Sequence, residues 1–288
     1  MDLSKNTKLQ YLSCITIDAE QEGRSLTFLN IKNCRALTYL NCSSNLISGI
    51  DLSQNPALRE LRCGDNPNLK ALDLSANTAL EILYCGFTEN LSSLDLSKNL
   101  NLHTVSFPAT GVNDLDMRML AGLKVLNCGA TGISALKLKA PESLEQLNIA
   151  ESKITTVNFN DFPKLESLAL GSNLTSFDLK PLRALKVLDC YRVTAPTLDL
   201  SANLNLDQLS IRLSAFKSLD LSRNTMLQSI FVFESANLAS LDLRNLVKLS
   251  SFGSTYNDNL KTICVNSIPD PANLKWFKDD WTSFVVCK

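Results

Sequence analysis

Apolar residues recur along the chain in one fixed order, and the clearest copy runs from residue 58 to residue 80. It reads LRELRCGDNPNLKALDLSANTAL: an L-x-x-L-x-C stretch, a short polar loop and an L-D-L-S-x-N-x-x-L stretch. The same order returns about every 21 residues along the chain. Self-similarity at a period of this length is the sequence signature of a solenoid, in which each turn buries its apolar face against its neighbours.

The first stretch predicts a strand in each repeat. Its second leucine and its cysteine alternate with other residue types, and a period of two is typical of a strand with one buried face. The copies begin at Leu9, Leu37, Leu58, Leu80, Leu102, Leu123, Leu144, Leu165, Leu185, Leu206, Leu227 and Leu249. We therefore expect about twelve short parallel strands in one sheet, joined by right-handed turns as in other parallel crossovers.

The spacing of the copies confines the length variation to one loop. The segment from the last apolar residue of L-D-L to the next cysteine position has a constant length, so insertions fall between the cysteine and the next L-D-L. The longest insertion lies within residues 15–25 and makes the first repeat 28 residues long, against 20–22 for the others. We predict a solenoid of about twelve repeats over residues 1–262 and a cap over residues 263–288.

Two columns of polar residues mark turns inside the solenoid. Asn, Ser or Thr stands three residues after most cysteine positions, as at Asn45, Asn66 and Thr88, and Asn follows L-D-L-S, as at Asn55 and Asn77. A buried turn leaves backbone amides and carbonyls that need partners. We interpret both columns as structural hydrogen-bond ladders.

The nine cysteines do not form the framework of a disulfide-rich domain. Six of them take the inward strand position that Ile, Leu or Val takes in other repeats: Cys14, Cys42, Cys63, Cys85, Cys128 and Cys190. Free cysteine acts there as a small hydrophobic residue, since neighbours about 4.8 Å apart and pointing in parallel are badly placed for a disulfide. A single column also cannot surround a zinc ion. Cys34 occupies a turn and is interpreted as a lone thiol.

The repeat pattern changes after Leu260. Asp270-Pro271 is typical of a helix start, with Asp as N-cap and Pro in the first turn, and predicts a short cap helix that continues to Lys278. The aromatic residues Trp276 and Trp281 would cover the last open turn. Cys264 begins this cap and Cys287 ends it with no other cysteine between them. We therefore predict a Cys264–Cys287 disulfide, which implies an oxidising compartment.

Composition narrows the possible functions. The net charge of −1 gives no attraction to nucleic acid or to a membrane surface, and no window of 18 apolar residues suggests membrane insertion. The single histidine, His103, has no catalytic motif around it, so we expect no enzyme activity, no cofactor and no metal. Calcium on the Asp column of L-D-L-S remains a minor alternative, because calcium-binding β-rolls need paired glycines that this chain lacks.

The motifs L-x-x-L-x-C and L-D-L-S-x-N together resemble the leucine-rich repeat family, in the type common in surface proteins of Bacteroidetes-like bacteria. The resemblance covers nearly the whole chain. It implies a mainly β horseshoe or arc with its parallel sheet on the concave side. Residues 1–4 are already in repeat register, so we expect upstream sequence, including an export signal, to have been removed. The protein is then extracellular or attached to the cell surface.

Two functions fit this reading: a monomeric module that binds a protein or a glycan on its concave sheet, or an architectural spacer without a ligand. Outward strand positions distinguish them. They are small or polar in repeats five to eight, as at Gln146 and Ser167, and more aromatic and charged toward each end. The candidate binding residues are Asp189, Tyr191, Arg212, Phe231 and Phe233, with a smaller set of Tyr39, Glu60, Arg62 and Tyr84. The alternative is that these side chains merely pack on one another and cover the sheet.

Overall fold

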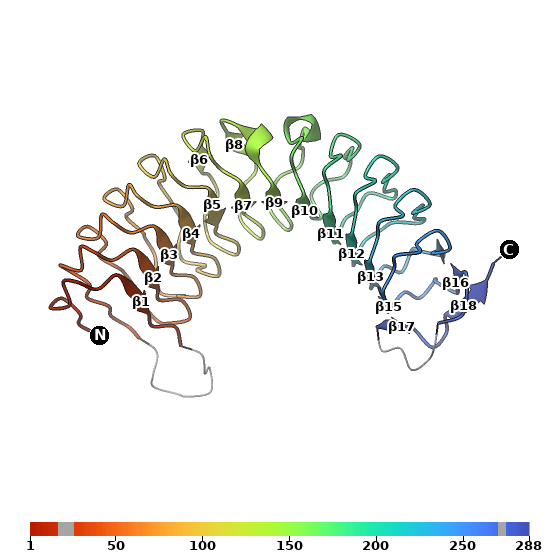
Figure 1. The fold of residues 1–288 in the computed structure, drawn as a ribbon, viewed down its shortest axis with the longest axis horizontal. Coiled ribbons are helices and arrows are strands. Elements are labelled where there is room, and N and C mark those ends of the chain that lie inside the picture. The colour runs from red at the N-terminus through yellow and green to blue at the C-terminus, as the bar shows by residue number, and fades with distance from the viewer. Residues whose placement is uncertain (17–25, 270–274, 288) are drawn as a thin grey trace. The chain divides into compact units, whose positions relative to one another are not determined.

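The computed structural model describes residues 1–16, 26–269 and 275–287, and over these residues the chain is a parallel β-solenoid of about twelve turns with almost no helix. Its internal contacts divide it into two compact units, Met1–Leu144 and Glu145–Lys288. Figure 1 shows how successive turns stack within each unit. The expected solenoid and its twelve repeat strands are therefore confirmed.

The first unit carries a parallel sheet with one strand from each repeat. In spatial order these strands are β1 (Tyr11–Ser13), β2 (Tyr39–Asn41), β3 (Glu60–Arg62), β4 (Ile82–Tyr84), β5 (Thr104–Ser106) and β7 (Val125–Asn127). A separate strand pair, β6 (Asp116–Met117) and β8 (Lys137–Leu138), lies at the L-D-L side, and a 3-10 helix η1 spans Pro141–Ser143. The long first loop is described as far as Thr16, and residues 17–25 lie outside the described residues.

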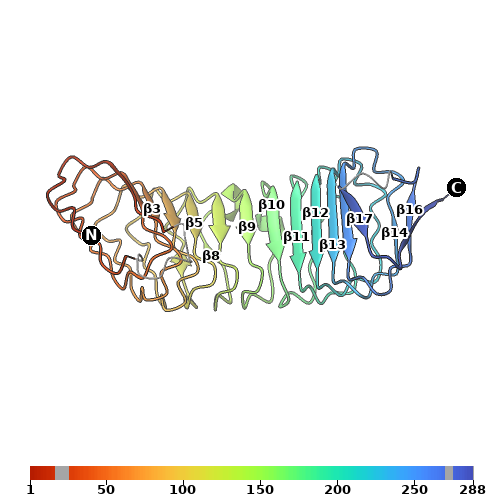
Figure 2. The same ribbon diagram turned by 90° about the horizontal axis from the view of Figure 1, so that it is seen from below.

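The second unit repeats this plan and adds one strand. Its main sheet runs through β9 (Gln146–Asn148), β10 (Ser167–Leu170), β11 (Val187–Tyr191), β12 (Gln208–Arg212), β13 (Ser229–Phe233), β15 (Ser251–Thr255) and β17 (Trp276–Lys278). Figure 2 shows β9 to β13 side by side and pointing the same way. The L-D-L side carries β14 (Ser240–Asp242), β16 (Thr262–Val265) and β18 (Ser283–Val286), and η2 spans Phe159–Asp161.

The strands pair in the register that the repeat predicts. Leu40 pairs with Leu61, and Leu61 with Leu83, and all three side chains are fully buried. The residues on either side of each leucine point outward and remain partly exposed. Period-two alternation therefore separates a core face from an accessible face in these turns, whereas all three residues of β5 are buried.

Most strands of the main sheet are followed by a residue in the left-handed backbone conformation, two positions after the cysteine position. Examples are Asp65, Phe87 and Leu213, with φ values of 53°, 57° and 53°. The next residue is the polar one of the first ladder. Asn66 is fully buried, and its amide nitrogen donates to the carbonyls of Cys42 and Cys63 at 3.0 Å, while its side-chain oxygen accepts from the amide of Ile47 at 3.0 Å.

The second ladder has the same role on the opposite side of the core. Asn77 donates to the carbonyls of Leu52 and Asn55 at 3.2 and 2.8 Å, and Asn99 donates in the same way to the turn before it. Cys34 takes this position in its own turn and is a buried free thiol 3.3 Å from the carbonyl of Leu3. Both polar columns thus bond the turns, as the sequence suggested.

The Asp residues of L-D-L-S close the following turn. Asp51 and Asp73 each accept a hydrogen bond from the backbone amide of the serine two residues on, at 3.0 and 2.9 Å. The hydroxyl and the amide of that serine lower the pKa of both carboxyls below its usual value. These carboxylates are therefore engaged with the turn of their own repeat.

The cysteines of the strand column are free thiols inside the core. Cys42, Cys63 and Cys85 are fully buried in three successive turns, whereas Cys14 is only half-buried. Burial raises the pKa of Cys85 to about 12, because the thiolate would lose its hydration. The thiols act as apolar core groups, in agreement with the sequence interpretation.

We expect iodoacetamide at pH 8 to modify the native protein slowly and at Cys14 first. The thiolate is the reacting species, and both burial and a raised pKa suppress it at the other positions. Peptide mass spectrometry after timed alkylation measures the rate at each site, and the denatured, unreduced protein is the control in which all seven free cysteines react. Rapid native labelling of Cys63 or Cys85 would contradict the buried ladder.

The cap differs from its prediction. Residues 270–274 of the predicted helix lie outside the described residues, but Trp276–Lys278 form strand β17, so the helix is wrong there. These residues extend the main sheet by pairing with β15, where Trp276 lies opposite Phe252. Because the last repeat strand would otherwise end with unpaired amides and carbonyls, strand addition satisfies more backbone groups than a helix would.

A disulfide and a small aromatic core hold the cap to the last turn. Cys264 on β16 is bonded to Cys287, with their Cα atoms 5.5 Å apart. The rings of Phe252, Trp276 and Phe284 lie within 5.6–6.1 Å of one another between centroids. The indole nitrogen of Trp281 donates to the carbonyl of Asn257 at 3.2 Å. Both tryptophans thus cover the final repeat.

Candidate ligand-binding face

The accessible face of the main sheet in the second unit carries the larger candidate set. Tyr191 pairs with Arg212 and Arg212 with Phe233, so these three side chains form one column. Asp189 and Phe231 lie in the neighbouring outward column, separated by Ser210. The structure thus brings the residues together in the register that the repeat predicts. Their role in binding stays a prediction.

Three phenylalanine rings form a cluster at the end of this column. The ring centroids of Phe231 and Phe233 are 6.0 Å apart, and Phe277 on β17 lies 6.4 and 6.2 Å from them. Gly253 lies beneath the cluster, because a Cβ atom there would come within 2.4 Å of the Phe277 ring and 2.8 Å of the Phe231 ring. The phenylalanines therefore pack on one another, yet Phe277 keeps 40% of its surface exposed.

Positive charge lies at the other end of the column. The guanidinium carbon of Arg212 is 5.9 Å from the centroid of the Tyr191 ring, and that of Arg192 is 5.3 Å from it. Arg192 is also ion-paired with Glu151 at 3.4 Å, whereas Arg212 is exposed and forms no ion pair with any described residue. The second unit thus presents an arginine and a tyrosine next to an aromatic cluster.

The smaller set gathers on β2, β3 and β4 of the first unit. Tyr39 lies opposite Glu60, and Arg62 lies opposite Tyr84. The Nε of Arg62 donates to Glu60 at 2.5 Å, and its guanidinium carbon is 4.3 Å from the centroid of the Tyr84 ring. The ring of Tyr39 stacks on that of Tyr11 at 4.2 Å. Three of these four residues therefore interact directly through Arg62.

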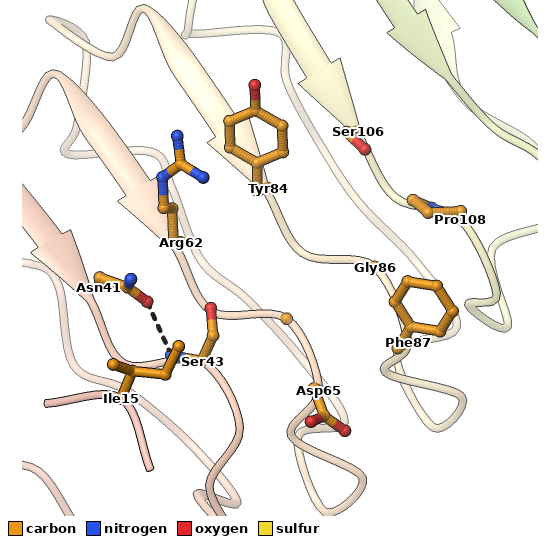
Figure 3. A pocket seen from close by; sticks show the side chains of 11 residues that line it. Ile15, Asn41, Ser43, Arg62, Asp65, Tyr84, Gly86, Phe87, Ser106 and Pro108 are labelled. Carbon is orange, nitrogen blue, oxygen red and sulfur yellow. Dashed lines mark hydrogen bonds between the residues drawn. The ribbon is translucent and has the colours of Figure 1, made fainter. Parts of the chain in front are cut away.

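A hollow of about 270 Å³ opens beside this set. Figure 3 shows Arg62 and Tyr84 on one side of it and Phe87 and Asp65 on the loops that follow β4 and β3. Its floor is backbone: a Cβ on Gly64 would come within 2.7 Å of the Gly86 carbonyl oxygen. The hollow thus adjoins two of the four residues of the smaller candidate set, Arg62 and Tyr84.

Sequence reasoning missed three aromatic residues that belong to these sites. Tyr11 was not assigned although it occupies the same outward position as Tyr39. Phe277 was assigned to a helix. Phe87 lies in the turn after β4, where the residue type varies from repeat to repeat. The repeat register places Tyr11 in the same outward column as Tyr39 and is enough to identify it. Phe87 can be recognised because a bulky apolar residue stands at a turn position that favours glycine.

The outward positions of β5, β9 and β10, which belong to neither candidate set, carry small or polar side chains. Thr104 and Ser106 on β5 are themselves buried, and on the second unit Gln146 is exposed and Ser167 half-buried. His103 is partly buried, with its Nδ1 3.0 Å from the hydroxyl of Thr104. In the described part of the chain, no group of three or more His, Cys, Asp or Glu residues is placed to hold a metal ion. No described helix is long and apolar enough to span a membrane.

Solved leucine-rich repeat proteins match this chain. The functional domain of InlJ from Listeria monocytogenes, described as including a cysteine ladder, is 27% identical, with a TM-score of 0.70 over 92% of this chain and 61% of that one. An internalin, inlF, from the same species is 20% identical, with a TM-score of 0.65 over 97% and 89% of the two chains. A leucine-rich repeat protein from Leptospira interrogans is 17% identical, with a TM-score of 0.57 over 85% and 84%.

The fold is a leucine-rich repeat solenoid. The likeness to inlF and to the Leptospira protein shows this fold alone, and the chain spans about 61% of the length of the InlJ structure. In this chain, Cys42, Cys63 and Cys85 are buried free thiols that directly follow the neighbouring strands β2, β3 and β4. No protein-family model and no curated protein matches the chain.

Proposed function

We propose that this chain is a non-enzymatic binding module that holds a protein on the accessible strand face of its second unit. The observation that carries this proposal is the column of Tyr191, Arg212 and Phe233 with Phe231 and Phe277 beside it. Tyrosine and arginine are enriched at the energetic centres of protein interfaces, and aromatic rings supply much of the buried apolar area there. Repeat scaffolds typically bind partners over such an extended face.

Packing of the sheet alone gives no reason for this composition. The same outward positions hold Gln146, Asn148 and Ser167 in the first two strands of the unit, and these strands pair in the repeat register without aromatic side chains. Water-exposed phenylalanine lowers solubility unless a partner covers it. The aromatic column therefore favours a ligand over a purely architectural spacer.

The proposal includes an extracellular or cell-surface location on a bacterium. The Cys264–Cys287 disulfide supports it, because disulfides form and persist in oxidising compartments and are rare in the cytosol of mesophiles. We also propose that the chain is a monomer, because a second copy packed on the accessible face would cover the ligand site.

The first prediction concerns this face. A purified array of extracellular proteins is screened for a binder, and affinity for that binder is then measured by calorimetry. We expect Tyr191→Ala and Phe233→Ala each to weaken binding by more than about 1 kcal/mol, because each removes buried aromatic area at the centre of the interface.

Two variants from the same sheet serve as matched controls. Gln146→Ala and Ser167→Ala lie on β9 and β10 and should leave the affinity unchanged. Circular dichroism establishes that all four variants are folded. If both aromatic variants bind as tightly as the parent protein, the site is wrong and the spacer function is preferred.

A further inference from the structure

We propose that the hollow beside Arg62, Tyr84 and Phe87 in the first unit binds a neutral sugar ring. This site is separate from the protein-binding face proposed on the second unit and uses none of its residues. It takes a different class of ligand. The argument rests on its size, its charges and the exposed side chain of Phe87.

The hollow is the right size for one small ring. Its volume is about 270 Å³, just below the range of about 300–1,000 Å³ in which drug-sized ligands bind. The floor is formed by two glycines that have no room for a side chain. A Cβ on Gly64 would meet the Gly86 carbonyl, and a Cβ on Gly86 would come within 2.5 Å of the Pro108 ring. Small residues thus keep the space open, and the close backbone contacts hold its shape.

The walls combine aromatic rings with hydrogen-bonding groups. Tyr84 and Phe87 supply apolar surface, and Figure 3 shows Asn41, Ser43 and Ser106 around the same opening. An aromatic face carries partial negative charge that attracts the weakly positive C–H bonds of a sugar ring. Hydroxyls of the sugar would meet the amide and hydroxyl groups at the rim. The lining therefore matches a ligand with one apolar face and a polar edge.

The charges in the hollow favour a neutral ligand. Arg62 already donates through Nε to Glu60, while its terminal nitrogens donate to no described residue. Asp65 lies in the lining and is exposed, without an ion pair to any described residue. Within the lining, Asp65 would repel a carboxylate ligand and Arg62 would repel an ammonium ligand, whereas Glu60 lies outside the lining and is already paired with Arg62. A hydroxyl both donates and accepts, so a neutral sugar can pair with either charged side chain without repulsion from the other.

The presence of a large apolar side chain at position 87 is the observation that the fold does not explain. The φ of Phe87 is 57°, in the left-handed region where bulky side chains are disfavoured, and 65% of its surface is exposed. Nine other turns after strands of the main sheet hold a residue in this conformation, and none of the nine is a phenylalanine. A large exposed apolar side chain that its turn does not need is a feature of binding surfaces. The exposed ring is therefore assigned to the ligand and not to the stability of the turn.

The experiment is saturation-transfer NMR on the whole chain with single sugars at millimolar concentration. The neutral probes are glucose, galactose, mannose and N-acetylglucosamine. Glucuronate and glucosamine are the negatively and positively charged comparisons, and N-acetylphenylalanine amide represents a peptide side chain. We expect at least one neutral sugar to bind, with the strongest transfer to its ring C–H protons, and the charged analogues to bind more weakly.

Phe87→Asn is the decisive variant. Asparagine tolerates the left-handed conformation better than phenylalanine, so the melting temperature should stay the same or rise while affinity for the sugar falls by about tenfold or more. Leu213→Asn makes the same change at the equivalent, exposed position of the second unit, where φ is 53°. It should leave sugar binding unchanged.

Three results would overturn the assignment. One is the absence of transfer to every neutral sugar. The second is stronger binding of glucuronate, glucosamine or the phenylalanine amide than of any neutral sugar, which would identify another ligand class. The third is sugar binding that survives Phe87→Asn, which would place the sugar elsewhere. None of these results bears on the protein partner, because the variants of Tyr191 and Phe233 test that site separately.

Discussion

Replacing both Cys264 and Cys287 by serine is expected to lower the free energy of unfolding of the cap by roughly 3 kcal/mol. The bond joins β16 to the residue after β18, with a sequence separation of 23, and the entropy lost by an unfolded loop of this length gives that magnitude. Both tryptophans lie in the cap. Urea unfolding followed by tryptophan fluorescence therefore measures the cap, while circular dichroism follows the solenoid.

The parent protein in reductant is the matched control for the serine variant. Its fluorescence transition should move to the position of the variant, and reductant should not move the variant further. If reductant leaves the parent transition unchanged, the disulfide does not stabilise the cap, and the argument from it for an oxidising compartment loses its support.

Asn66→Ala is expected to destabilise the first unit by about 1–3 kcal/mol. The change removes three donated hydrogen bonds to the carbonyls of Cys42, Cys63 and Gly64 and one accepted from the amide of Ile47. The carbonyls of Cys42 and Cys63 and the amide of Ile47 lie inside the solenoid, where water cannot replace the lost partner without entering the core. Chemical denaturation followed by circular dichroism measures the loss.

Asn68→Ala is the control, because the residue type and the neighbourhood are the same but the side chain is exposed. Its only hydrogen bond to a described residue is a long one of 3.4 Å to the carbonyl of Leu46. We expect a change within about 0.5 kcal/mol, as for other surface substitutions. A larger loss for Asn68→Ala than for Asn66→Ala would mean that the ladder does not bond the turns.

The repeat period was enough to predict which side chains share a column. Tyr191, Arg212 and Phe233 lie one above another because a constant number of residues separates each leucine from the next strand position, and parallel pairing preserves that register. The repeat period does not predict whether each residue of the first polar column is buried, and Asn173 is the example. It stands in the polar column by sequence, yet its side chain is exposed and donates to the carbonyl of Ser152 from outside the core.

The errors occur where the repeat ends or where a turn carries an unexpected side chain. Asp270-Pro271 is a valid local signal for a helix, but local preference does not reveal that β15 has a free edge, and Trp276–Lys278 pair with it. The position of Phe277 followed from that pairing and could not be obtained from the helix. The role of Phe87 depends on the empty space above Gly64 and Gly86, which becomes visible only when three turns are stacked.

The left-handed residue after most strands of the main sheet also makes the chain a suitable scaffold for directed evolution. One side chain per turn projects from this conformation, and nearly every chemical type occurs there: Ser44, Asp65, Phe87, Ala109, Ala130, Glu151, Arg192, Leu213, Glu234 and Tyr256. Hydrogen bonds of the flanking residues impose the backbone shape, so the side chain itself is interchangeable. A library randomised at this row alone would vary the chemistry along the rim of the sheet while leaving every buried leucine, cysteine and asparagine untouched.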